Sequence, residues 1–235
     1  MTHPLRLHYA PDNASLCIRL AMLELGLPFE AVLVDRSISA QKSPAYLALN
    51  PNGLIPVLET PHGPLFETGA ILLWLADTYG GQTPGFFPPL ADPDRGNALK
   101  WLFWLSNTLH ASERMLFYPD LYTTGGATMA QAQTACTKTR IAAHLDVLTS
   151  ATDTPWLDAD LASAQGCYLA ALLRWPALYG DADGWFDLHR WPRLLAFAKR
   201  TEQRPAAITA ALAEGLGPQP FSAPVDCQPP EGSAV

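Results

Sequence analysis

The chain has 235 residues, of which 49% are hydrophobic and 16% are charged, a composition that buries a core in one large domain or two small ones. Its formal net charge is −7 and it contains no run of Lys and Arg, which argues against nucleic acid and anionic membrane as partners. The N-terminus has no apolar signal core and no stretch reaches the length of a membrane span, so we expect a soluble, cytoplasmic protein.

The first part of the chain alternates between strand and helix patterns. Residues 5–9 alternate apolar and polar side chains, which predicts a strand, and residues 14–25 are apolar at helical spacing. Residues 29–35 predict a second strand, which should lie parallel to the first through a right-handed crossover. Ser43 and Pro44 open a short helix, because proline is well placed in the first helical turn.

Residues 50–79 combine a strand interrupted by proline, a strand reversal and the start of an apolar helix. Pro56 has no N–H, so the main-chain groups of Ile55 are free to pair outside the sheet, above all if the bond between them is cis. These groups can form one antiparallel pair of main-chain hydrogen bonds with an extended ligand. Glu67 and Thr68 lie at the start of the helix, where unpaired N–H groups attract a carboxylate and an acidic side chain accepts from an ammonium group. The implied ligand has an α-amino acid head and a peptide body.

The segments NPNGLIPVLE and FETGAILLWLAD resemble the glutathione-binding half of the cytosolic glutathione transferases. Pro56 stands at that family's cis-proline, and Glu67 and Thr68 stand at its acidic and hydroxyl pair. The resemblance covers roughly residues 4–214 and is nearest to the bacterial beta class, through YAPDNASL, LSNTLH and LRWPALYG. It implies a thioredoxin-like α/β domain at residues 1–80 that binds glutathione, followed by an all-α helical bundle.

The second part of the chain has helical patterns only. Residues 81–94 are rich in glycine and proline and predict a linker. Residues 95–216 predict an all-α domain that forms the electrophile cleft, with helices at 97–117, 128–150, 162–175, 191–200 and 205–216. Residues 217–235 are a Pro-rich tail that either drapes over the bundle or is disordered.

The four cysteines, Cys17, Cys136, Cys167 and Cys227, have no metal-ligand spacing among themselves or with the histidines. Three of them sit in apolar helical patterns, and buried, reduced thiols are the simplest interpretation. No metal site is predicted.

The resemblance implies that the chain holds the sulfur of glutathione as a thiolate, the form that attacks electrophiles. A hydrogen-bond donor and the positive end of a helix lower a thiol pKa, and the start of the 14–25 helix supplies both. The beta-class cysteine is replaced by Ala14, which excludes a mixed disulfide there. The hydroxyl of serine-dependent relatives falls on Asp12, whose carboxylate we expect to turn away. Ser15 is the first candidate for the sulfur donor and Asn13 the second, although each could instead serve as helix cap or turn former.

The resemblance assigns further residues to the site. The glutathione-binding set is Leu54, Ile55, Pro56, Glu67, Thr68 and Arg36. In this set Arg36 replaces a family lysine that has no counterpart near residues 37–39. His110 matches a histidine of the beta-class cleft and joins Ser15 and Asn13 as a catalytic candidate, with a core or surface histidine as the alternative. The electrophile cleft, expected between residues 9–13 and one face of the 97–117 helix, consists of Tyr9, Pro11, Phe103, Asn107, His110 and Arg114.

The function implied is detoxification by conjugation of glutathione, as co-substrate, to a small hydrophobic electrophile. A homodimer is expected, with its two-fold axis between the 68–79 helix of one subunit and the 97–117 helix of the other. One alternative is a glutathione-dependent isomerase, peroxidase or ether-cleaving enzyme on the same fold. Another is a non-catalytic glutathione-binding or interaction module.

Overall fold

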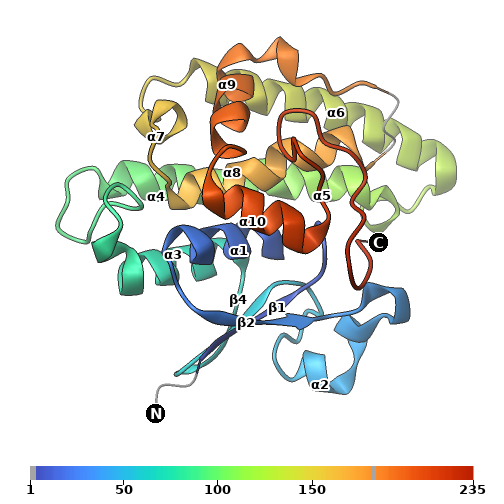
Figure 1. Ribbon diagram of the computed structural model, residues 1–235. Coiled ribbons are helices and arrows are strands. Elements are labelled where there is room, and N and C mark those ends of the chain that lie inside the picture. The colour runs from blue at the N-terminus through green and yellow to red at the C-terminus, as the bar shows by residue number, and fades with distance from the viewer. Residues whose placement is uncertain (1–3, 181–183, 235) are drawn as a thin grey trace.

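The computed structural model describes residues 4–180 and 184–234. Figure 1 shows a sheet with its helices built from the N-terminal part of the chain, and a larger group of helices stacked above it. This order of an α/β part and an all-α part confirms the fold class predicted from the sequence.

The sheet has four strands in the order β2-β1-β3-β4. Their bounds are β1 (Leu5–Tyr9), β2 (Phe29–Leu33), β3 (Val57–Thr60) and β4 (Gly63–Phe66). As predicted, β1 runs parallel to β2, and it runs antiparallel to β3, which forms a hairpin with β4. Leu7 pairs with Leu58 across the central strands, and both side chains are fully buried.

Three helices cover this sheet, namely α1 (Ser15–Glu24), α2 (Pro44–Leu47) and α3 (Thr68–Tyr79). Leu16 of α1 and Ile71 of α3 join Leu58 in the main hydrophobic core. Val57 points to the opposite face of the sheet, since side chains alternate along a strand, and packs there with Tyr46 of α2 in a smaller cluster.

The second part of the chain is helical. Its helices are α4 (Arg95–Trp104), α5 (Ala111–Phe117), α6 (Gly126–Ser150), α7 (Pro155–Asp158), α8 (Ala164–Arg174), α9 (Pro192–Thr201) and α10 (Pro205–Glu214). Every residue of α8 is buried, as its nearly uniform apolar sequence predicts. Ser163 caps this helix, and its hydroxyl accepts from the N–H of Gly166 at 2.9 Å. Helix α1 packs against α8 and α10, so one core joins the two parts.

The single helix expected at residues 97–117 is instead α4 and α5 with the π-helical segment Leu105–His110 between them. A π-helical turn closes i→i+5 hydrogen bonds and therefore rotates the residues that follow it relative to a regular α-helix. Trp101, Leu105 and Leu109, which recur at four-residue spacing, are buried. Residues before and after the segment, however, no longer share one face.

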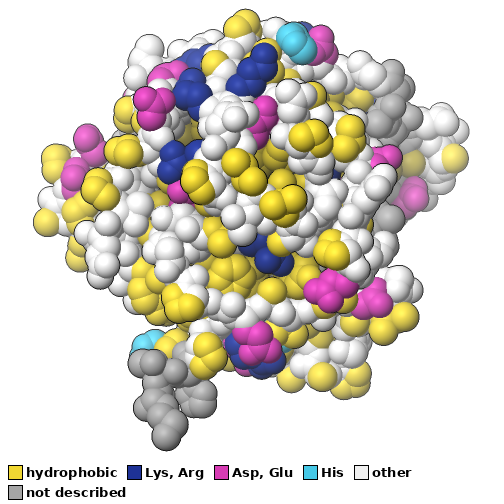
Figure 2. Space-filling view, viewed as in Figure 1, with side chains coloured by type: hydrophobic (Ala, Val, Ile, Leu, Met, Phe, Trp, Pro, Cys, Tyr) yellow, Lys and Arg dark blue, Asp and Glu magenta, His cyan; other side chains and the backbone are white. Residues whose placement is uncertain are grey.

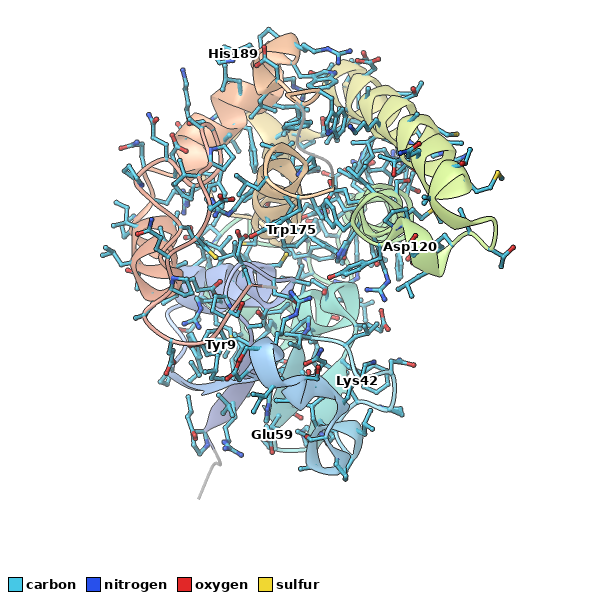
Figure 3. All side chains as sticks on the ribbon, turned by 90° about the vertical axis from the view of Figure 1, so that its right-hand side faces the viewer. Tyr9, Lys42, Glu59, Asp120, Trp175 and His189 are labelled. Carbon is cyan, nitrogen blue, oxygen red and sulfur yellow. The ribbon has the colours of Figure 1, made fainter. Side chains whose placement is uncertain are left out.

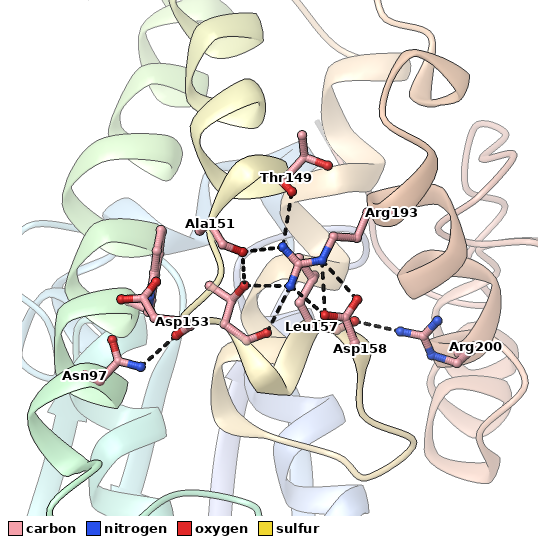
Figure 4. A network of polar contacts seen from close by, with 10 residues as sticks. Asn97, Thr149, Ala151, Asp153, Leu157, Asp158, Arg193 and Arg200 are labelled. Carbon is pink, nitrogen blue, oxygen red and sulfur yellow. Dashed lines mark hydrogen bonds and ion pairs between the residues drawn. The ribbon is translucent and has the colours of Figure 1, made fainter.

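Helix α7 was not predicted from the sequence pattern, and a polar network holds it in place. Arg193 at the start of α9 pairs with Asp158 of α7 and donates to the carbonyl oxygens of Thr149 and Ala151 (Figure 4). One guanidinium therefore joins the end of α6, helix α7 and the start of α9.

The tail after α10 forms no helix or strand at residues 217–234, yet it is packed against the helical part. Phe221 is fully buried, and the hydroxyl of Ser222 donates to the buried carboxylate of Glu202 at 2.6 Å. The red trace in Figure 1 descends from α10 toward the turn that follows β2. Of the two predicted alternatives, the tail takes the draped one.

Across the described residues, no helix combines the length and the apolar character needed to cross a membrane. On the face shown in Figure 2, basic and acidic side chains are interspersed among hydrophobic ones. The negative charge of the chain is therefore not gathered into one patch on this face.

Candidate functional site

A cavity of about 680 Å³ lies between the sheet part and the helical part. Its walls come from the loop between β1 and α1, the segment before β3, the start of α3, and helices α5 and α8. Lys42 lines it from the sheet side and Trp175 from the helical side, as their positions in Figure 3 show. A cavity of this size at the junction of two parts is typical of a site for a small molecule.

The segment before β3 presents free main-chain groups to the cavity. The Ile55–Pro56 peptide bond is cis, as predicted. No hydrogen bond within the described parts of the chain engages the N–H or the C=O of Ile55. The carbonyl of Leu54, in contrast, accepts from the hydroxyl of Tyr46 at 2.9 Å and from the amide of Asn50 at 2.8 Å. Leu54 therefore anchors the turn, and Ile55 is left to pair with a ligand.

The same turn lies against the segment that follows β2. Gly53 has a φ of +60°, and a Cβ at this position would lie 2.9 Å from the carbonyl oxygen of Gln41. Only glycine combines that backbone conformation with so close an approach. The contact places Gln41 and Lys42 in the cavity wall next to Gly53.

Helix α3 begins at the cavity wall. Glu67 precedes the helix with a φ of +74°, and its exposed side chain forms no capping hydrogen bond. Thr68 is buried at the first helical position. The first N–H groups of a helix carry partial positive charge and lack partners within the helix, so this end of α3 favours a carboxylate. Glu67 supplies a negative charge beside it.

Asp12 lines the cavity, but its carboxylate, which we expected to turn away from the sulfur, is engaged by donors of the helical part. Its carboxylate accepts from Arg174 at 2.8 and 2.9 Å, from the indole of Trp175 at 2.9 Å and from the hydroxyl of Tyr179 at 2.6 Å. The N–H of Asp12 donates to Glu214 of α10 at 2.8 Å. These contacts fix the loop between β1 and α1 to the helical part.

The two predicted sulfur donors occupy different environments. Ser15 is fully buried and outside the cavity wall, and its hydroxyl donates to the carbonyl oxygen of Ala10 at 3.1 Å. Asn13 lines the cavity, and its Oδ1 accepts from the N–H of Ala14 at 2.9 Å, which leaves the amide NH₂ as a donor. The geometry therefore does not support the first choice, Ser15, because its hydroxyl faces the protein interior. It favours Asn13.

His110 lines the cavity next to the buried Tyr168. Its Nδ1 lies 2.8 Å from the hydroxyl of Tyr168. Burial, together with the positive charge of Arg114, lowers the pKa of His110 to about 4. The imidazole is therefore neutral at neutral pH and can exchange hydrogen bonds but supplies no charge. Burial also raises the pKa of Tyr168, whose hydroxyl lies within reach of Thr68 and thereby connects α8 to the start of α3.

Among the residues that the structure describes, three cations line the cavity. Arg36 donates to the carbonyl oxygen of Ala234 and, at 3.1 Å, to the hydroxyl of Tyr118. Arg114 lies over the ring of Tyr118, with 5.3 Å from Cζ to the centroid, and has no carboxylate partner in the described residues. The ammonium of Lys42 lies 3.5 Å from the carbonyl oxygen of Asn52. The cavity thus carries positive charge that a ligand can neutralise.

Four residues predicted for the electrophile cleft lie elsewhere, namely Tyr9, Pro11, Phe103 and Asn107. Tyr9 is 3% exposed, with its hydroxyl bonded to Glu231 of the tail, and Pro11 is also buried. Phe103 is 54% exposed and Asn107 is exposed, because the π-helical segment separates their face from that of His110 and Arg114. Only His110 and Arg114 of the predicted set line the cavity.

The structure adds cavity residues that the sequence did not reveal. Lys42 provides the cation that was missing near residues 37–39, displaced along the chain by two 3-10 turns. A lysine two residues before a helix-opening proline was a signal that could have pointed to it. Tyr168 and Ala234 had no local signal, because each reaches the cavity only through packing of distant segments.

The cysteines carry no chemistry in this cavity. Cys17 and Cys167 are buried, as predicted, and burial raises the pKa of both thiols. Cys136 is exposed on α6, contrary to the prediction, because it lies on the outward face of that helix. Within residues 4–180 and 184–234, no group of three or more His, Cys, Asp or Glu side chains is placed to hold a metal ion.

Comparison with known proteins places the cavity in a family context. Residues 15–78 match the family model described as the N-terminal domain of glutathione S-transferase. A glutathione S-transferase of Xanthomonas campestris pv. campestris is 30% identical over 218 residues, which span 90% of this chain and 100% of that protein.

Two solved structures share the architecture. A glutathione transferase homologue from Sulfitobacter with bound glutathione aligns with a TM-score of 0.75 and 25% identity, over 88% of this chain and 96% of the other. A bacterial beta class glutathione S-transferase of Sphingomonas chungbukensis aligns with a TM-score of 0.70 and 30% identity, over 89% of this chain and 98% of the other.

Proposed function

Because the chain belongs to the glutathione S-transferase family, we propose that it joins the thiolate of glutathione to small hydrophobic electrophiles. The observation that carries the proposal is one cavity in which the unpaired main chain of Ile55, the start of α3 and the side chain of Asn13 face a common space. We assign glutathione binding to residues 1–80 and the electrophile wall to residues 95–216.

The chemistry of glutathione matches the groups along the cavity. Its γ-glutamyl end carries an ammonium and a carboxylate, which suit Glu67 and the first N–H groups at Thr68. Its cysteinyl unit has a main-chain N–H and C=O, which pair with the free groups of Ile55 in one antiparallel rung. Its glycyl carboxylate then extends toward Lys42, the cation next to Gly53. Arg36, which the resemblance assigned to glutathione, is engaged instead by Ala234 and Tyr118.

The sulfur then lies toward the loop between β1 and α1. The amide NH₂ of Asn13 donates to it, and the N-terminal end of α1 and the guanidinium of Arg114 add positive potential. These groups lower the thiol pKa, so that the thiol proton is released to water and the thiolate persists at neutral pH. Neutral His110 contributes a hydrogen bond and no charge.

Reaction requires an electrophile next to that sulfur. The helical wall offers Phe117, Leu121 and Trp175, an apolar surface for an aromatic or unsaturated substrate. With an aromatic halide, the sulfur lone pair forms the S–C bond and the C–halogen bonding pair leaves with the halide. With an unsaturated substrate, the sulfur adds to the double bond, whose π pair then takes up a proton from water. Rate is gained from a stabilised thiolate held beside its target.

Two measurements on the purified protein test the proposal. We expect retention on glutathione-agarose with elution by free glutathione, and glutathione-dependent turnover of chlorodinitrobenzene followed by absorbance. Retention without turnover of this or any other halide, enone or peroxide would indicate a glutathione-binding module that does not catalyse the transfer. Absence of retention would remove glutathione as the ligand.

We also propose a homodimer in which α3 of one subunit meets α4 of the other. Ile71 and Leu75 of α3 and Trp101 of α4 are buried within one chain and are not free for this contact. Phe103 of α4 is 54% exposed and available. Light scattering should report a dimer that Phe103→Glu dissociates, whereas Leu212→Glu, at a 77% exposed leucine of α10, should leave it intact.

A further inference from the structure

The tail after α10 is anchored by a buried cation before it reaches the cavity. Arg174 is fully buried, and its guanidinium donates to the carbonyl oxygens of Leu216, Pro220 and Val225 at 3.2, 3.1 and 2.8 Å. Beyond these contacts, the N–H of Gln228 donates to the carbonyl oxygen of Gly215 at 2.8 Å. The path of residues 216–228 is therefore set by the helical part.

The last described residues of the tail contact the sheet part instead. The hydroxyl of Tyr9, at the end of β1, donates to the carboxylate of Glu231 at 2.6 Å. A Cβ at Gly232 would lie 2.6 Å from the side chain of Leu33 at the end of β2, so the tail is pressed against the strand ends here. Arg36 holds the carbonyl oxygen of Ala234, and Ala234 lines the cavity.

The tail thus occupies space that the sequence assigned to the electrophile. Tyr9 and Pro11 were expected to line the cleft, but the tail segment at residues 231–234 covers them. Arg36 joins this segment to Tyr118, at the C-terminal end of α5, by bonding both. Arg36 therefore connects the sheet part, the end of the tail and the helical wall at one edge of the cavity.

We propose that the end of the tail, through Ala234, forms the part of the cavity wall next to Tyr118 and limits the size of the group that the sulfur can carry. The inference rests on the proposed glutathione site. Its physical basis is steric, because a wall held at Tyr9, Leu33 and Arg36 cannot yield to a larger substituent without breaking those contacts.

Binding by the full-length protein tests the wall without requiring turnover. The probes are glutathione, S-methylglutathione and S-nitrobenzylglutathione, and calorimetry gives each Kd. Ala234→Trp fills space at the wall, so it should raise the Kd of S-nitrobenzylglutathione by about fivefold or more and change that of glutathione less than about twofold. Ala223→Trp is the matched control, because Ala223 is an exposed tail alanine outside the cavity.

A second pair of variants loosens the wall. Glu231→Ala removes the acceptor of Tyr9 and should lower the Kd of S-nitrobenzylglutathione relative to S-methylglutathione. Asp226→Ala is its control, because Asp226 is an exposed acidic tail residue with no side-chain bond to the described residues. If the Kd values of the three probes keep the parent's ratios in all four variants, the proposed wall is refuted, and the proposed glutathione site is unaffected. If the parent binds none of the probes, the proposed function itself is overturned.

Discussion

Replacing Asp12 by asparagine leaves the charge of Arg174 without its counter-ion in a site that excludes water. Asparagine tolerates the positive φ of +49° at this position, so the substitution changes charge without straining the backbone. Both side chains of the pair are 0% exposed, and four hydrogen bonds converge on the carboxylate. Removing one partner of such a buried pair costs about 3–5 kcal/mol.

The introduced amide would keep one acceptor oxygen, so we take the lower bound for Asp12→Asn, about 3 kcal/mol, which corresponds to a fall in Tm of about 6–12 °C for a chain of this length. Urea unfolding followed by tryptophan fluorescence, at fixed protein concentration, measures the loss. Asp153→Asn is the control, since Asp153 also accepts from a tryptophan and a cation, Trp101 and Lys100, but is half exposed. It should cost much less than Asp12→Asn, because solvent screens an exposed ion pair.

Equal losses in the two variants would refute the argument, because burial would then not decide the energy of the pair. Arg174→Met provides a further check in the same assay. It removes the donor of three tail carbonyl oxygens as well as the partner of Asp12, so it should cost more than Asp12→Asn.

The site and its surroundings support three further predictions. Asn13→Ala should lower kcat/KM for chlorodinitrobenzene by about tenfold and raise the pKa of bound glutathione, read from thiolate absorbance, while Ser15→Ala should not raise that pKa. Lys42→Ala should raise KM for glutathione by about threefold to tenfold with kcat retained, and an equal fall in kcat would contradict a role in binding alone. Glu113 is fully buried with both carboxylate oxygens unpaired, and burial raises its pKa well above the usual 4.5. Since the folded state then binds a proton that the unfolded state has released, Glu113→Gln should gain stability over the parent as pH rises above 4.5, measured by urea unfolding at several pH values.

The sequence predicted the part of the site that depends on local signals. Ile55, Pro56 and Thr68 are neighbours along the chain, and a proline or a helix start has the same consequence in any context. Asn13 and His110 were placed at the cavity for similar reasons, by a loop and by a matching motif. These residues needed no knowledge of how distant segments pack.

The errors arose where packing decides. Phe103 and Asn107 were assigned from the spacing of a regular α-helix, and the π-helical segment Leu105–His110 broke that spacing. Ser15 is polar and close to the site in sequence, but its hydroxyl is engaged by Ala10. Tyr9 was expected in the cleft, and a tail segment 222 residues further along the chain covers it.

All five N–H groups of the Arg174 guanidinium are used, shared between Asp12 of the loop beside Asn13 and three carbonyl oxygens of the tail. A binding partner that displaced the tail would remove these carbonyl acceptors from Arg174, the same cation that holds the loop through Asp12. Detachment of the C-terminal segment and loss of order in the loop beside Asn13 are therefore coupled, so we expect mutations in the tail to alter activity without contacting a substrate.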